Sequence, residues 1–481
     1  MELVINYPDI VERYAVQFKD HFSKEDYEHF KRYLSGLILS NNKTVEGISR
    51  LFVLDPIDQS TLNRFLKKDT YDIAALHKSR LTWLQQNPKT AFKSSGVLII
   101  DNSLLTHYGC RMDHIQRLYD HVTNSQVMAH DLVTLHYADQ LVNYPIANEL
   151  WKPLDVVKME EALLSAKVKL KESKKILKTQ SPRKWKQYLT DIRRRHKNKS
   201  EVAAAYHTKI DIAIKLLRQH FENYPDCNLP TAIDNWYCVP EMHQFFEELK
   251  RTYVMAIKSD EQVCLEGNKL ISIAQFIEKL KTEHLQNQKK GEGAAVFHKK
   301  GYQEYVSKDE KISKEKAQEQ RYCYVKTHTI KNIGRVRLLI SYKSADLSDK
   351  PIVCICNDLT LRAEDMLSIY RLRWPIEVFH EEGKAEGLDK YQLRDFTAIN
   401  RHIAWVVFAY SFLQYAQTDD TFLQHFKQQL GITAVAGLPF LRRLSKAHAL
   451  FHLAQWVYMG VQRGFDFADI IKPFCLATAY T

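Results

Sequence analysis

The sequence predicts a mixed α/β fold, in which a sheet-containing core with a β-rich insertion is flanked by helical regions at both ends of the chain. Three observations support this prediction. The 481 residues are enough for about three domains, each with its own core. Only 15 glycines and 13 prolines occur, and so few helix breakers favour long helices over an all-β fold. The spacing of apolar residues is helical at both ends of the chain and strand-like in its middle.

Residues 1–92 are the first helical region. Tyr27, Phe30 and Leu34 recur at three- and four-residue steps, which is the spacing of an amphipathic helix. Ser23 stands just before this run and is followed by two acidic residues, as at a helix start. We therefore expect a small helical domain here.

The next part of the chain predicts the element order β-β-β-α-β-α-β. Its first apolar run is a buried strand that ends at Asp101, and it forms an antiparallel set with the two runs that follow. A second short apolar strand, which follows an amphipathic helix, ends at Asp234. The expected strands are 97–100, 126–137, 141–150, 229–233 and 253–258, and the expected helices are 201–221 and 240–250.

The remaining chain returns from strands to helices. Residues 259–320 are polar and weakly periodic. A helical stretch begins at Glu364 and continues to about Lys390, and residues from 399 to the end are helical again. Between these regions we expect three closely spaced strands, at 322–330, 335–342 and 352–356.

Several classes of protein find no support in the sequence. No secretory signal is visible, and the longest apolar run, residues 403–413, is about half of the ~20 residues that cross a bilayer. The cysteines form no CxxC pair, and neither HExxH nor CxxC with HxxxH occurs, so no disulfide framework or zinc site is expected. Phosphate-binding glycine motifs are absent, so no nucleotide cofactor is expected. We expect a cytoplasmic protein that does not contact a membrane.

One helix face near residue 377 has side chains suited to a nucleic-acid backbone. At 100° per residue, Tyr370, Arg373, Glu377 and Lys384 fall within about 60° of one another. This face combines a carboxylate that can bind a metal with two cations and a phenol that can bind phosphate. Pro375 removes a helical hydrogen bond and predicts a kink. From this helix alone, a solvated charged face with i,i+4 pairs is an equally good interpretation.

The spacing Tyr370-x2-Arg373-x3-Glu377-x6-Lys384 resembles the YREK signature of DDE transposases of the insertion sequence 4 family and its relatives. The segment Asp234-x2-Tyr237 is also similar to this group, and a weaker resemblance covers most of residues 95–410. The resemblance implies an RNase H-like mixed-sheet core, interrupted by a β-rich insertion before the catalytic glutamate.

The resemblance also implies a catalytic triad of Asp101, Asp234 and Glu377 that holds Mg²⁺, for which Mn²⁺ can substitute. Two such ions about 4 Å apart activate the attacking oxygen, stabilise the leaving oxygen and neutralise the phosphate. Carboxylate oxygens are suitable ligands for these hard cations. The residues expected to contact DNA phosphates near the cleaved end are Tyr370, Arg373 and Lys384.

The function implied by the resemblance is that of a bacterial, nucleoid-associated cut-and-paste DNA transposase, which binds terminal inverted repeats of an insertion sequence, cleaves DNA and transfers the strand. Its expected partners are double-stranded DNA and a second copy of the chain. Two alternatives stay open: an inactive or repurposed transposase that only binds DNA, and an RNase H-like nuclease without strand transfer. The expected domains are a DNA-end-binding domain (1–92), the first part of the catalytic core (93–258, with a basic insert at 160–200), a β-rich insertion (259–350), the second part of the core (351–398) and a helical dimerisation domain (399–481).

The net charge of +12 comes from one segment of the chain. Residues 167–199 hold 14 basic residues and two acids, and the rest of the chain is balanced at 55 basic and 55 acidic residues. We interpret this segment, which also contains Trp185 and Tyr188, as a DNA-backbone surface. A solvated helix or a disordered connector is the alternative. The residues expected to bind DNA here are Lys174, Lys175, Arg193, Arg194 and Arg195.

Overall fold

The computed structural model describes residues 4–290, 295–302, 319–431 and 437–479. The chain divides into two compact units. The first unit contains Met1–Asp101, Thr134–Ala147 and Asn223–Thr481, and the second contains Asn102–Val133 and Asn148–Glu222.

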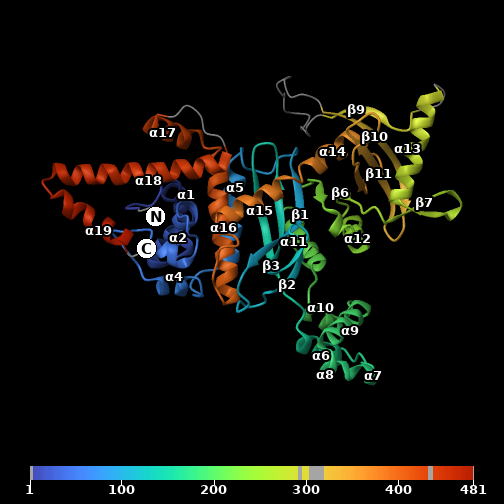
Figure 1. Cartoon of the computed structure of the whole chain (residues 1–481), viewed down its shortest axis with the longest axis horizontal. Coiled ribbons are helices and arrows are strands. Elements are labelled where there is room, and N and C mark those ends of the chain that lie inside the picture. Colours follow the sequence, from blue (N-terminus) through green and yellow to red (C-terminus); the bar gives the residue numbers. More distant parts are fainter. Residues whose placement is uncertain (1–3, 291–294, 303–318, 432–436, 480–481) are drawn as a thin grey trace. The chain divides into compact units, whose positions relative to one another are not determined.

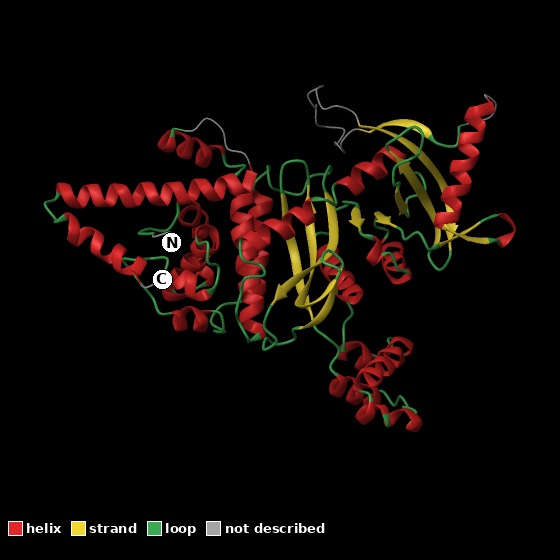
Figure 2. Cartoon of the chain, viewed as in Figure 1, coloured by secondary structure: helices red, strands yellow, loops and turns green. Residues whose placement is uncertain are grey.

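A mixed sheet of twelve strands, counted over the described residues, confirms the α/β prediction (Figures 1 and 2). Its main path runs β2-β3-β1-β5-β6-β12-β11-β10-β7-β8, with β4 beside β3 and β9 beside β10. The strands are β1 (Val97–His107), β2 (Gln116–Asp120), β3 (Ser125–Ala138), β4 (Asn143–Trp151), β5 (Thr231–Ile233), β6 (Tyr253–Ala256), β7 (Gln262–Cys264), β8 (Leu270–Ser272), β9 (His298–Tyr302), β10 (Glu319–Ile330), β11 (Gly334–Tyr342) and β12 (Ile352–Cys356).

Strands β1, β5 and β6 are parallel neighbours at the centre of the sheet. Ile100 of β1 pairs with Ile233 of β5, which in turn pairs with Met255 of β6. On one face of these strands, Val97, Ile99 and Ala232 are buried in a common hydrophobic core. The prediction that the first strand ends at Asp101 is wrong, because β1 continues to His107 and Asp101 lies within it.

The sheet continues beyond the central strands through the chain that follows α12 (Pro240–Leu249). β12 is antiparallel both to β6 and to β11, and β11 pairs in turn with β10 along its length. The polar region after residue 259, which had no element assigned to it from the sequence, contains β7, β8, β9 and the helix α13 (Ile273–Lys290). The short strands β7, β8 and β9 thus extend the same sheet, and α13 follows β8 in the chain.

The helical region at the start of the chain packs around α16 (Phe396–Ala416), which is almost entirely buried. Trp405 of α16 stacks on Phe65 with ring centroids 5.8 Å apart and meets the ring of Phe30 edge-on. The apolar run 403–413 is therefore the interior helix of this region, and no described helix is long and apolar enough to span a bilayer. The surrounding elements are α1 (Asp9–Ala15), η1 (Val16–His21), α2 (Lys24–Leu39), α3 (Val45–Ser49), α4 (Gln59–Phe65), α5 (Ile73–Gln86), α17 (Asp420–Leu430), α18 (Gly437–Gln462) and α19 (Phe467–Ala479).

The second unit has a small helical core of its own. Trp185 is 2% exposed and packs with Leu163 and Leu189, and its Nε1 donates a hydrogen bond to Glu160 (2.6 Å). The basic segment is therefore folded, and Trp185 is a core residue instead of part of an exposed surface. The helices of this unit are α6 (Val156–Ser165), α7 (Glu172–Lys175), α8 (Leu177–Gln180), α9 (Pro182–Arg195), α10 (Ser200–Ala205) and α11 (Lys209–Asn223).

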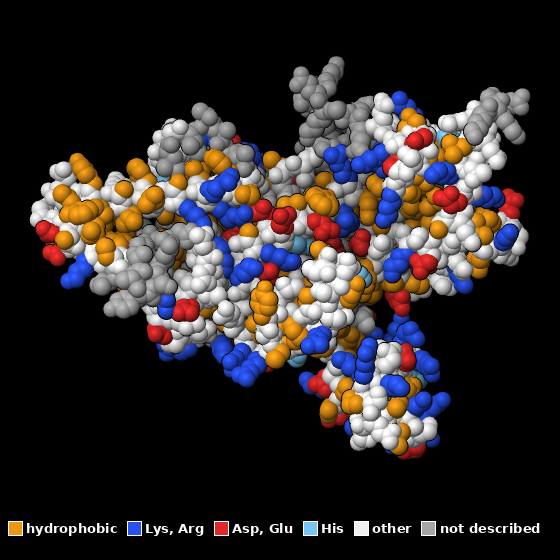
Figure 3. Space-filling model, in the orientation of Figure 1, with side chains coloured by type: hydrophobic (Ala, Val, Ile, Leu, Met, Phe, Trp, Pro, Cys, Tyr) orange, Lys and Arg blue, Asp and Glu red, His pale blue; other side chains and the backbone are white. Residues whose placement is uncertain are grey.

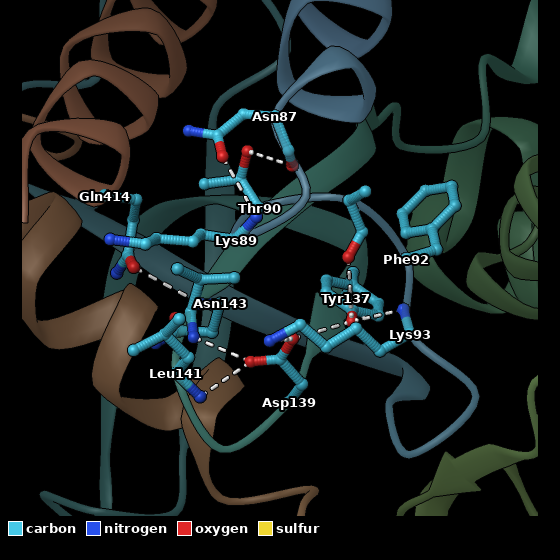
Figure 4. Close-up of polar contacts among 12 residues, drawn as sticks. Asn87, Lys89, Thr90, Phe92, Lys93, Tyr137, Asp139, Leu141, Asn143 and Gln414 are labelled. Atoms are coloured by element: carbon cyan, nitrogen blue, oxygen red, sulfur yellow. Dashed lines mark hydrogen bonds and ion pairs between the residues drawn. The ribbon is translucent and has the colours of Figure 1, made fainter. Parts of the chain in front are cut away.

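A hydrogen-bond network fixes the turn between β3 and β4 (Figure 4). The Asp139 carboxylate accepts from the backbone N–H groups of Leu141 (2.6 Å) and Val142 (2.8 Å) and from the Tyr137 hydroxyl (2.9 Å). The Tyr137 hydroxyl in turn accepts from the backbone N–H of Lys93 (2.9 Å), just before β1 begins. This network ties the entry of β1 to the β3–β4 turn.

Candidate active site

Two neighbouring parallel strands place Asp101 and Asp234 side by side. Each residue follows one member of the pair Ile100–Ile233, and neighbouring strands lie about 4.8 Å apart. Side chains alternate along a strand, so Asp101 faces the same side as Val97 and Ile99, and Asp234 the same side as Ala232. Both carboxylates therefore stand at the edge of the hydrophobic core that these apolar residues form.

Helices α14 (Ala363–Arg371) and α15 (Pro375–Ala385) cover that core. Ile369 and Ile376, one from each helix, are buried in it. The helical stretch predicted from Glu364 to about Lys390 is interrupted at residues 372–374, where the sequence predicts a kink. Pro375 has no N–H to donate and is the first residue of α15. The break leaves Arg373 between the two helices.

Arg373 links two members of the proposed triad. Its Nη1 lies 3.0 Å from Oε1 of Glu377 and 3.4 Å from Oδ2 of Asp101. The side chains of Arg373 and Asp101 are 15% and 16% exposed, whereas that of Glu377 is 40% exposed. Two carboxylates from residues 276 positions apart in the chain thus share one guanidinium at the surface of the core.

The electrostatics of Arg373 show that the third acid acts on the same group. Burial works to lower the pKa of Arg373, but Tyr370, Asp101 and Asp234 raise it, and so does the hydrogen bond to Glu377, so that the pKa ends above its ordinary value. Asp234 also caps the short helix η2 (Asn235–Tyr237) by accepting from the N–H of Trp236 at 3.4 Å. Arg373 is thus held in place as a permanent cation.

Tyr370 and Lys384 lie on either side of this centre. The Tyr370 ring packs against the hydrophobic core, with the Arg373 guanidinium 5.7 Å from its centroid. Burial raises the pKa of Tyr370, so its hydroxyl keeps its proton at neutral pH and can donate a hydrogen bond. Lys384 lies two turns after Glu377 on α15 and is partly exposed.

His380 is a further candidate ligand that the sequence did not single out. One of its ring nitrogens and oxygens of Asp101 and Glu377 lie within 4.8 Å of one another. Burial, with Lys384 and Arg373 nearby, lowers the pKa of His380 to about 3, so the imidazole is neutral at neutral pH. Its i,i+3 spacing from Glu377 on one helix was the signal for this contact.

The donor set fits a hard divalent cation. Asp101, Asp234 and Glu377 offer carboxylate oxygens, which Mg²⁺ prefers, and few protein ligands leave room for water and substrate. The partial exposure of Asp101 and Glu377 agrees with such access. Two other acids of the chain between Asp101 and Asp234 have partners of their own. Asp131 is buried and pairs with Lys209 at 2.8 Å, and Asp139 accepts hydrogen bonds within the β3–β4 turn.

The five basic residues predicted to bind DNA differ in their surroundings. Lys174, Lys175, Arg194 and Arg195 are exposed, and Figure 3 shows Lys and Arg side chains spread over the small helical unit that carries them. Arg193 is 7% exposed, pairs with Asp211 at 2.5 Å and lies over the Tyr206 ring. The structure thus gives Arg193 partners within its own unit.

Comparison with known proteins identifies two family models along the chain. A model described as DDE superfamily endonuclease matches residues 17–275, which is more than half of the chain. A model described as Transposase DDE domain matches residues 198–412. The first range includes Asp101 and Asp234, and the second includes Asp234 and Glu377. No curated protein matches the chain.

Proposed function

The chain belongs to the DDE superfamily of endonucleases, and from this premise we propose that it is a cut-and-paste transposase of the insertion sequence 4 type. It would bind the terminal inverted repeats of its element, cleave the DNA there and transfer the strand to a target. One observation carries the proposal: Asp101 and Asp234 follow paired residues on adjacent parallel strands, and Arg373 joins Asp101 to Glu377.

We assign metal binding to Asp101, Asp234 and Glu377. Mg²⁺, or Mn²⁺ in its place, would supply Lewis acidity to the attacking and leaving oxygens when held by these three carboxylates. Asp101 lies in β1 and Asp234 directly follows β5, both central strands of the sheet, whereas Glu377 lies on helix α15 with its side chain 40% exposed. The sheet therefore sets the position of two ligands, and the helix brings the third to the side from which substrate enters.

The cations of the site are assigned to the DNA backbone. Arg373 can offer its remaining N–H groups to a phosphate while Nη1 stays near the two carboxylates. Lys384 adds a second positive charge along α15, and the Tyr370 hydroxyl adds a neutral donor. These groups would hold the scissile phosphate against the carboxylates.

The reaction needs two copies of the chain, because one chain carries one such triad and an element has two ends. The described residues of α18, of α19 and of the loop between them carry exposed apolar side chains suited to pairing, and Figure 3 shows hydrophobic side chains gathered at the left of the view. They include Leu450, Phe451, Trp456, Tyr458, Met459, Val461, Phe465 and Phe467. We assign DNA-end recognition to the N-terminal helices and pairing of two copies to the C-terminal helices.

The proposal is tested with purified full-length protein, Mg²⁺ and a DNA that contains the gene with its native flanking sequence. Wild type should cut at both borders of the element and join the released ends to a target plasmid. Asp101→Asn, Asp234→Asn and Glu377→Gln should each abolish cutting while mobility-shift assays show retained DNA binding. Asp226→Asn, at an exposed loop position, is the matched control and should cut like wild type.

Other outcomes distinguish the alternatives. Specific binding of the borders by wild type without any cutting would support the inactive DNA-binding protein. Cutting without joining would support the nuclease without strand transfer. Wild-type cutting by any one of the three variants would overturn the role of that residue.

A further inference from the structure

A second cluster of metal-binding side chains lies away from the proposed active site, where the first helix of the chain meets two C-terminal helices. Asp9 is the first residue of α1, His425 lies on α17, and His448 and His452 lie on α18. The two α18 histidines are four residues apart, so they project from the same face of the helix. Three imidazoles thus surround one carboxylate.

Three of the four side chains lie close enough together to share one metal ion, and His425 joins them through its contact with Asp9. Asp9 Oδ2 lies 3.6 Å from His425 Nε2 and 3.8 Å from His448 Nδ1, and Asp9 Oδ1 lies 3.9 Å from His452 Nε2. The ligand atoms of Asp9, His448 and His452 all lie within 4.8 Å of one another. Ligands about 2.0–2.1 Å from a tetrahedral ion are about 3.3 Å apart, so small side-chain shifts would complete the geometry.

The orientation of His448 favours a metal over a simple ion pair. Its Nε2 is in hydrogen-bond contact with Oε1 of Gln429, an acceptor, so Nε2 carries the proton when the ring is neutral. Nδ1 then directs a lone pair toward the Asp9 carboxylate, an arrangement that a cation between them stabilises. Ligating histidines commonly donate their second ring N–H to an oxygen in this way.

The surroundings also disfavour a charged imidazole at this position. His448 is 1% exposed and packs against the ring of Phe426, with centroids 4.7 Å apart. A neutral, buried imidazole is a ligand for Zn²⁺ and similar ions.

We propose that Asp9, His425, His448 and His452 form a structural site for a divalent transition metal of the Zn²⁺ class. Four protein ligands close the coordination shell, as in structural zinc sites, and leave no position for substrate. The ion would fasten α1 to α17 and α18, which are more than 400 residues away in sequence. Mg²⁺ is a hard cation that prefers oxygen ligands, so it would compete weakly at this site, where three of the four donors are imidazole nitrogens.

The test uses full-length protein that carries Asp101→Asn and Glu377→Gln, so that the acidic site cannot hold the probe ion. Co²⁺ replaces Zn²⁺ as a spectroscopic probe. We expect one bound equivalent of Co²⁺ with the strong visible absorption of a four-coordinate ion. In this background, His425→Gln and His452→Gln should each weaken Co²⁺ binding at least about tenfold.

Both substitutions are at partly exposed positions, so they should leave the fold intact, unlike a change of the buried His448. His207→Gln, at an exposed histidine, is the matched control and should bind Co²⁺ like the parent. Zn²⁺ should raise the thermal unfolding midpoint of the control and leave that of His452→Gln unchanged. Absence of bound Co²⁺, or binding that neither substitution weakens, would overturn the proposal.

Discussion

At the scale of single residues, Arg373 is the most informative side chain of the site. It contacts the carboxylates of Asp101 and Glu377, and Asp234 also contributes to raising its pKa. Its single positive charge therefore offsets part of the negative charge of the three acids. The same charge would repel a divalent ion bound to those acids. In our proposal, Arg373 both organises the carboxylates and contacts the DNA phosphate.

This dual role predicts opposite effects of Arg373→Met on metal and on DNA. Removal of a positive charge about 5 Å from a divalent ion should tighten Mn²⁺ binding at least about tenfold, since that repulsion is worth about 1.7 kcal/mol even in water. DNA cleavage should fall, because the phosphate loses its guanidinium contact. Mn²⁺ electron paramagnetic resonance titration and a cleavage assay measure the two effects.

Arg335→Met, at an exposed position on β11, is the control for the loss of one charge and should change neither quantity. Weaker Mn²⁺ binding by Arg373→Met would show that Arg373 only positions the carboxylates.

At the scale of elements, the basic segment is a set of short helices around its own hydrophobic core. Trp185 is buried in this core. Arg193, one of the five residues predicted to bind DNA, is buried and forms an ion pair with Asp211. The remaining four basic residues are exposed. The positive charge of this segment was visible in the sequence. Which of its basic residues are buried and which are exposed was not visible, because that depends on which face of each helix packs against the core.

This division makes the proposed DNA surface testable. Reversing Lys174, Lys175, Arg194 and Arg195 to Glu should reduce the salt dependence of DNA binding, with the slope of log K against log salt smaller by up to about 3.6. The four positions are exposed, so the fold should be kept. Fluorescence anisotropy with duplex DNA over a range of NaCl concentrations measures the slope.

The matched control reverses four exposed lysines elsewhere, at Lys279, Lys331, Lys343 and Lys350. An equal change of slope in the two variants would show a general charge effect. An unchanged slope in the first variant would remove the basic segment from the DNA surface.

At the scale of the whole molecule, buried neutral histidines predict a loss of stability in acid. Burial lowers the pKa of His136 to about 3 and that of His402 to about 4, against an ordinary value of about 6.5. Unfolding at pH 5 therefore takes up two protons at these sites, so their contribution to stability is complete above pH 6.5 and is lost as the pH falls. The slope of the free energy of unfolding against pH from these two groups should steepen as the pH falls and approach about 2.7 kcal/mol per pH unit near pH 5.

His136→Phe should remove about half of that slope, because phenylalanine does not titrate. Urea denaturation between pH 7 and pH 5, in the presence of a chelator, measures it. His207→Phe, at an exposed histidine, should keep the wild-type slope. Equal slopes for His136→Phe and wild type would show that His136 is protonated in the folded protein.

Local patterns in the sequence were enough to predict the fold class, the central strands, the main helices and the kink at Pro375. Alternating or helical spacing of apolar residues indicates which face of a single strand or helix is buried. Proline interrupts a helix locally, because it lacks a backbone N–H. Those same patterns placed Asp101 and Asp234 in or after apolar strands. They misjudged the length of β1, because its polar second half is extended by pairing within the sheet and not by an apolar run.

Only the tertiary structure decided which of these residues meet. The register between β1 and β5 sets Asp101 beside Asp234. Packing of α14 and α15 over the sheet brings Arg373 and Glu377 close to Asp101. Packing of the small helical unit buries Arg193. The cluster of Asp9 with three C-terminal histidines joins the two ends of the chain, so no motif of neighbouring residues could indicate it. Contacts between distant segments depend on the packing of whole elements, and a local sequence pattern carries no record of that packing.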